Sequence, residues 1–141
     1  MRRIGLTTAS GLALATGLAA FTLSFGAVKA SACTPGEEAC PVVLKMRPGA
    51  VSITVAGAVS LAKPAFFFSF DANAGQRVVI HTTGAVLRGQ APFTAPNGDN
   101  DAFDLDQPYK LPTSGTYTFS CLANTQAEDS FGKFRMTLTI K

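Results

Sequence analysis

Two segments near the C-terminal end alternate strictly between apolar and polar residues, and this alternation constrains the fold more than any other feature. Tyr117 to Ala123 and Phe134 to Ile140 each place an apolar side chain at every second position. A period of two is the spacing of side chains along one face of a β-strand. One apolar and one mostly polar face per strand predicts a sheet with one buried side.

Shorter stretches upstream show the same β character. Val51–Val59 and Arg77–Thr82 are rich in β-branched residues, and residues 66–70 carry Phe at every second position. The turn-forming residues 71–76 predict that strands 66–70 and 77–82 pair as an antiparallel hairpin.

Prolines and glycines mark further turns along residues 50–141. Pro92 and Pro96 predict that any strand between them lies at the edge of a sheet, because proline cannot donate to a ladder. No segment of the mature chain shows a helical period of 3.6 residues. Seven or eight short strands with frequent turns predict an all-β fold, an antiparallel β-sandwich or jelly roll, over residues 50–141.

Residues 1–32 have the order of a secretory signal peptide. Paired arginines at positions 2 and 3 precede an uncharged apolar stretch that ends in the small residues Ala30–Ala32. We expect cleavage after Ala32 or Ala30, and therefore a periplasmic or secreted protein without a membrane span in its mature form. The alternatives are an uncleaved transmembrane anchor, since the stretch is long enough to span, and lipid anchoring through Cys33.

Removal of residues 1–32 changes the charge balance. The whole chain has 12 Lys and Arg against 9 Asp and Glu, and three of the basic residues lie in the signal segment. The mature chain therefore carries nine of each and has a net charge near zero. This balance predicts no partner that requires a basic patch, such as nucleic acid or an anionic membrane.

All three cysteines lie in the exported part, where disulfides are stable. Cys33 and Cys40 lie close together in residues 33–49, which we expect to form an irregular leader closed by a disulfide between them. Cys121 alternates in phase with apolar residues, so we expect it to be buried and free.

The chain lacks a recognisable catalytic set, and we expect no enzymatic activity. His81 is the only histidine, and a nucleophilic pair with Cys121 would require both side chains to meet at a partly exposed site. No catalytic, phosphate-binding or zinc-binding motif occurs.

An acidic segment is the densest polar cluster. It holds Asp99, Asp101, Asp104 and Asp106, whose oxygens are ligands that Ca²⁺ prefers. The spacing does not match an EF-hand loop. Two interpretations follow. The segment is a solvated loop, which we favour, or it is a calcium site, in which case Ca²⁺ would be the only cofactor of the protein.

Three turn motifs carry a resemblance to a known family. They are Asp71-Ala-Asn-Ala-Gly75-Gln76 between two strands, Pro96-Asn97-Gly98, and Leu111-Pro-Thr-Ser-Gly115-Thr-Tyr117 before a late strand. Over residues 50–141 the chain resembles the bacterial pre-peptidase C-terminal domain family and, within it, is similar to the periplasmic inhibitors of g-type lysozyme. The resemblance implies a non-catalytic β-sandwich that binds through loops.

We expect the binding surface in segments 96–106 and 124–131, at one end of the sandwich. The candidate side chains are polar and can hydrogen-bond outward: Asn97, Asp99, Asn100, Asp101, Asn124, Gln126, Glu128 and Asp129. The partner would be a protein, such as a lysozyme, or a glycan. The inhibitors carry basic residues in the loop between the last two strands, whereas here the loop is acidic, which predicts weak inhibition or none. The alternative function is an envelope or secretion accessory module, stabilised by calcium.

Overall fold

The computed structural model describes residues 32–126 and 130–141, and these residues form strands, turns and loops without a helix. In this part of the chain, no helix is long and apolar enough to cross a membrane. The predicted all-β class is therefore confirmed. The strands are β1 (Val42–Val43), β2 (Ser52–Val59), β3 (Ala65–Ala72), β4 (Arg77–Gly84), β5 (Gln90–Thr94), β6 (Asn100–Asp104), β7 (Tyr109–Lys110), β8 (Gly115–Leu122) and β9 (Gly132–Ile140).

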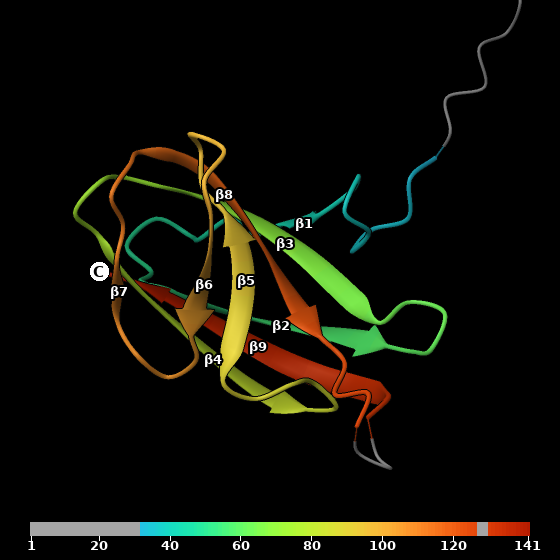
Figure 1. The fold of residues 1–141 in the computed structure, drawn as a ribbon. Helices are drawn as coiled ribbons and strands as arrows, with labels where there is room; N and C mark the ends of the chain where they lie inside the picture. Colours follow the sequence, from blue (N-terminus) through green and yellow to red (C-terminus); the bar gives the residue numbers. More distant parts are fainter. Residues whose placement is uncertain (1–31, 127–129) are drawn as a thin grey trace, which may run out of the picture. The chain divides into compact units, whose positions relative to one another are not determined.

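The strands form two sheets that pack as a β-sandwich (Figure 1). The five-stranded sheet has the order β1-β3-β8-β5-β6, and the four-stranded sheet has the order β2-β9-β4-β7. Every pairing is antiparallel except that of β1 with β3. The leader, residues 33–49, is irregular apart from β1. The signal segment predicted for residues 1–32 lies, up to residue 31, outside the described residues.

The core lies between the apolar faces that the alternation predicts. Phe68 and Phe119 are neighbours in the five-stranded sheet, and their rings stack with centroids 5.4 Å apart. Phe134 of the four-stranded sheet meets Phe68 edge-on at 6.2 Å. All three side chains are almost fully buried. Burial of each such side chain stabilises the fold by about 1.5–3 kcal/mol, so the aromatic faces hold the two sheets together.

The predicted hairpin of strands 66–70 and 77–82 is wrong. β3 pairs with β8 in one sheet, and β4 pairs with β9 in the other. The turn between them carries the chain from sheet to sheet. Its backbone is held by a distant segment, since Gly75 N donates to Leu111 O at 2.8 Å and Ala74 N donates to Ser114 Oγ at 2.8 Å. Tertiary contacts, which the local sequence does not encode, therefore decide the partner of each strand.

The edge position predicted for the strand at Pro92 is also wrong. β5 lies inside the five-stranded sheet, between β8 and β6. Its pairing with β8 involves only Phe93 and Thr94. Pro92 pairs with Ala102 of β6 but lies outside the stretch that pairs with β8, so its missing N–H removes no hydrogen bond to β8.

The predicted disulfide between Cys33 and Cys40 is present, with a Cα–Cα distance of 5.6 Å. The bond occupies the Cys33 thiol, which is the group that lipid anchoring would need. Cys121 is buried and free, as predicted. Leu44, just after β1, is also buried, so the leader contributes to the core.

Candidate functional site

The first residues of segment 96–106 and the first residues of segment 124–131, which were predicted to form one binding surface, lie at opposite ends of β8. The turn after β5 lies beside the first residue of β8, since a Cβ on Gly115 would be 2.8 Å from Pro96 Cβ. Segment 124–131 follows the last residue of β8. An eight-residue strand is about 27 Å long, so residues 96–99 and 124–126 do not form one surface. Residues 104–106 lie at the other end of β6, where Leu105 N donates to Gly89 O at 2.8 Å. We call the end at residues 95–99 and 111–115 the hairpin end (Figure 1).

At the hairpin end, the predicted binding side chains bond to one another and to near neighbours. Asn97 Nδ2 donates to Asp99 Oδ2 at 2.6 Å. Thr94 Oγ1 donates to Asn100 Oδ1 at 2.7 Å. These bonds rigidify the turn between β5 and β6.

Asp101 bonds to the neighbouring edge of the other sheet. Tyr109 OH donates to Asp101 Oδ2 at 3.1 Å. Burial, together with this carboxylate, raises the pKa of Tyr109 above its usual value. The contact connects β6 of one sheet with β7 of the other.

The four aspartates predicted as calcium ligands have separate partners. Asp99 and Asp101 make the bonds just described, Gln90 Nε2 donates to Asp104 Oδ1 at 3.0 Å, and Asp106 Oδ1 lies 2.5 Å from His81 Nδ1. Within the described ranges, no three Asp, Glu, His or Cys side chains gather as metal ligands. The carboxylates therefore lie dispersed along β6 and the turn that follows it.

The end opposite the hairpin end is built from loops tied together by backbone hydrogen bonds. Ala123 N donates to Pro64 O at 2.7 Å, and Leu87 N donates to Leu122 O at 2.6 Å. These bonds join residues 60–64, 84–89 and 123–126. We call this end, with residues 130–131, the apolar end (Figure 1).

Three large apolar side chains are exposed at the apolar end, one on each loop. Leu61 is 81% exposed, Leu87 37% and Phe131 40%. In the described part of the chain only two other large apolar side chains are similarly exposed, Val43 and Val51. Sequence reasoning missed the three because it selected polar residues. Apolar residues within predicted loops were the signal that could have found them.

The predicted polar residues of this end are partly described. Gln126 N donates to the Asn124 side-chain oxygen at 3.3 Å, which closes a local turn. Glu128 and Asp129 lie outside the described residues. Two shallow pockets, of about 240 and 340 Å³, lie near Asn124 and near His81 respectively, and Arg88 lines both. Arg88 therefore presents its charge beside the exposed apolar side chains.

The structure does not bring His81 and Cys121 together. His81 lies on the outer face of the four-stranded sheet and contacts Asp106, and both side chains are more than half exposed. Cys121 faces the core from β8, where burial raises the pKa of its thiol to about 12. A protonated thiol inside the core is not a nucleophile.

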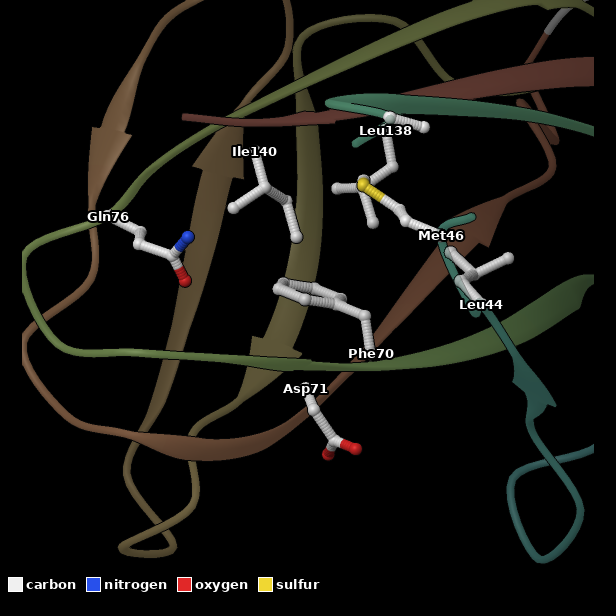
Figure 2. A pocket seen from close by; sticks show the side chains of 8 residues that line it. Leu44, Met46, Phe70, Asp71, Gln76, Leu138 and Ile140 are labelled. Carbon is white, nitrogen blue, oxygen red and sulfur yellow. The ribbon is translucent and has the colours of Figure 1, made fainter. Parts of the chain in front are cut away.

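A further pocket of about 180 Å³ lies between the sheets near the hairpin end (Figure 2). In Figure 2, the side chains of Met46, Phe70, Leu138 and Ile140 point toward one another, while Asp71 points away from them. The Asp71 carboxylate instead accepts a hydrogen bond from Thr116 Oγ1 at 2.5 Å. The pocket is therefore lined by apolar side chains and the Gln76 amide, while the Asp71 carboxylate points away from it.

The two packed antiparallel sheets and their tied loops define a small β-sandwich with a loop-built end. Solved structures with a similar fold are periplasmic inhibitors of g-type lysozyme. The inhibitor PliG of Salmonella Typhimurium has a TM-score of 0.57 and 23% identity, and the match covers 71% of this chain and 96% of that one. A mutant of the Escherichia coli inhibitor has a TM-score of 0.56, 22% identity and the same coverage. The Aeromonas hydrophila inhibitor has a TM-score of 0.54 and 18% identity, with 71% and 95% covered.

At these identities, the likeness shows a shared fold. No protein-family model and no curated protein sequence matches the chain. The resemblance to the pre-peptidase C-terminal domain family therefore remains a prediction.

Proposed function

We propose that this chain is an exported, non-enzymatic protein that binds a g-type lysozyme through the apolar end. The observation that carries the proposal is that Leu61, Leu87 and Phe131 are exposed on three loops at the same end of the sandwich. Apolar side chains exposed singly are ordinary, but a group of them on adjoining loops is typical of a protein-binding surface.

The construction of the apolar end supports tight binding. Its loops are joined by backbone hydrogen bonds at Pro64–Ala123, Leu87–Leu122 and Ala85–Lys133. Loops that are ordered before binding lose less conformational entropy in the complex. Arg88, next to Leu87, adds a side chain that is frequent among residues dominating interface energies.

The fold supports the choice of partner. The three solved inhibitors share the sandwich over 95–96% of their own lengths. These inhibitors are periplasmic, which agrees with the signal-like residues 1–32 and with the disulfide at Cys33. In our proposal the apolar end contacts the rim of the lysozyme cleft and blocks access to the glycan substrate.

The test uses mature protein, residues 33–141, and a g-type lysozyme acting on bacterial cell walls. Leu87→Ser and Phe131→Ser are expected to raise the dissociation constant at least about tenfold each, because each removes an apolar contact. Val51→Ser is the matched control, because Val51 is 51% exposed and lies beside the end of β9, away from the apolar end.

Equal loss in Val51→Ser and Phe131→Ser would place the interface elsewhere. No inhibition and no binding by the wild-type protein at micromolar concentration would reject the lysozyme as partner and favour an accessory module. Mass spectrometry of the exported protein tests the location, with an N-terminus at Cys33 as the expected result.

A further inference from the structure

Charged residues of the strands separate completely between the two sheets. The four-stranded sheet holds Arg77 in β4, Lys110 in β7, and Lys133 and Arg135 in β9, and its strands contain no Asp or Glu. The five-stranded sheet holds Asp71, Asp101 and Asp104, and its strands contain no Lys or Arg. The near-zero net charge of residues 33–141 therefore conceals two sheets whose strand charges have opposite sign.

The four cations share the outer face of their sheet. Val78 and Ile80 point into the core, so Arg77 points outward by alternation. Phe134 and Met136 are likewise buried, which directs Lys133 and Arg135 outward. All four cationic side chains belong to exposed or partly exposed residues on one side of the sandwich.

Two of these cations lie directly opposite each other. Arg77 pairs with Lys110 across β4 and β7. Like charges in opposite positions of an antiparallel pair destabilise a sheet. Within the described residues, the ion pairs are Lys63 with Glu37 and His81 with Asp106. Neither Arg77 nor Lys110 therefore has a carboxylate partner among these residues. An external anion bound beside Arg77 and Lys110 would reduce the repulsion between these two charges.

The cations form two groups on this face with hydroxyl groups between them. Arg135 lies opposite Thr83, six residues along β4 from Arg77, which is a separation of about 20 Å. Thr54 and Thr137 lie in the intervening rows, and their hydroxyl oxygens are 2.8 Å apart. Beside Arg135 and Lys133, the small residues Ala56 and Gly84 leave a depression of about 370 Å³.

We propose that the outer face of the four-stranded sheet binds an acidic polysaccharide, with anionic groups held by the two cation groups and sugar hydroxyls held by the threonines between them. The surface chemistry selects this occupant. The outward side chains of the four-stranded sheet's strands include no Phe, Tyr or Trp on which nucleic-acid bases could stack. They include no large aromatic or leucine group that could insert into a membrane. Among the described residues, the carboxylate that contacts this face is Asp106, and it is bound to His81.

This surface is distinct from the apolar end, so its test is independent of lysozyme binding. Polygalacturonate serves as the acidic polysaccharide and dextran as the neutral one, with binding followed by calorimetry at low salt. Wild-type mature protein is expected to bind polygalacturonate and not dextran. The affinity should fall as salt rises from about 0.05 M to about 0.5 M, because exposed charges are then screened.

The double variant Arg77→Gln/Lys110→Gln is expected to weaken binding about tenfold, the loss of two exposed charge contacts. Its melting temperature should stay level or rise, since a like-charge pair is removed. Lys63→Gln is the matched single-charge control for Arg77→Gln, because Lys63 already pairs with Glu37. Lys63→Gln should retain wild-type affinity.

Three results would overturn the proposal. They are no polygalacturonate binding by the wild-type protein at low salt, equal weakening by Lys63→Gln and Arg77→Gln, and equally tight binding to single-stranded DNA or anionic phospholipid vesicles. Inhibition of lysozyme should be unchanged in Arg77→Gln/Lys110→Gln, which separates this face from the apolar end.

Discussion

Replacing Gly57 with Ala is expected to destabilise the sandwich, because the Phe134 ring occupies the space that a Cβ would need. Gly57 pairs with Phe134 across β2 and β9, and a Cβ on Gly57 would lie 2.6 Å from Cζ of that ring. Ordinary carbon contacts are about 3.5–4.0 Å, so the ring would have to move by about 1 Å. Phe66 and Phe68 oppose that movement, since they pack edge-on against the ring at 5.7 and 6.2 Å.

Two effects of opposite sign set the size of the change. Overpacking of a core costs about 1–3 kcal/mol, while Ala in place of Gly regains about 0.5–1 kcal/mol by restricting the unfolded chain. We expect a net loss of about 1–2 kcal/mol in the free energy of unfolding, since the ring at Phe134 is nearly enclosed. For a domain of this size, the loss corresponds to a fall of about 4–8 °C in Tm.

The assay is urea denaturation of a double-mutant cycle with Gly57→Ala, Phe134→Leu and the combined variant. Leu at position 134 removes the ring atoms that the new Cβ would touch. The combined loss should therefore be smaller than the sum of the single losses by about 1 kcal/mol, as expected for residues in contact. Additive losses, or a Gly57→Ala protein more stable than wild type, would refute the reasoning.

Three further predictions concern the core and the acidic segment. The Cys121 thiol should resist labelling in the native protein and react after unfolding. Because burial raises its pKa to about 12, the free energy of unfolding should fall as pH rises above about 8.5, where the thiol of the unfolded chain ionises. Rapid native labelling would contradict its burial. Tyr117→Phe should lower the free energy of unfolding in urea by about 1–2 kcal/mol, since the Tyr117 hydroxyl donates to Thr113 O at 2.7 Å. A variant as stable as the wild type would show that water replaces this bond. Millimolar Ca²⁺ should leave Tm unchanged, because the carboxylates of residues 99–106 have separate partners, whereas a rise would establish a calcium site.

The strand positions were predictable because they depend on a local signal. Alternation places Phe68, Tyr117, Phe119 and Met136 on inner faces, and all four are buried. The disulfide was predictable for a similar reason, since Cys33 and Cys40 are only seven residues apart. A period of two reports which side of a strand is apolar, and this information is contained in a few neighbouring residues.

Strand partners were not predictable in the same way. The turn at Asn73–Gln76 has hairpin chemistry, yet it connects two sheets because residues 111–114 hold its backbone. Pro92 lies inside a sheet because the pairing of β5 with β8 stops at Phe93. Both outcomes depend on segments that are distant in the sequence.

The same division applies to the candidate surfaces. Segments 96–106 and 124–131 both have the composition of polar loops, but residues 96–99 and 124–126 lie at opposite ends of β8. Leu61, Leu87 and Phe131 lie far apart along the chain, and their loops share one end of the sandwich only because strand ends from both sheets meet there.

The amino-acid sequence was enough to predict the all-β class, the inner and outer face of each main strand, and the equal numbers of acidic and basic residues in residues 33–141. Only the tertiary structure decided that the strand cations share one sheet and the strand carboxylates the other. The difference arises because the two features depend on interactions over different distances along the chain. Side-chain direction follows from the geometry of each strand, whereas strand order follows from the burial of whole apolar faces against each other, a free energy to which residues throughout the chain contribute.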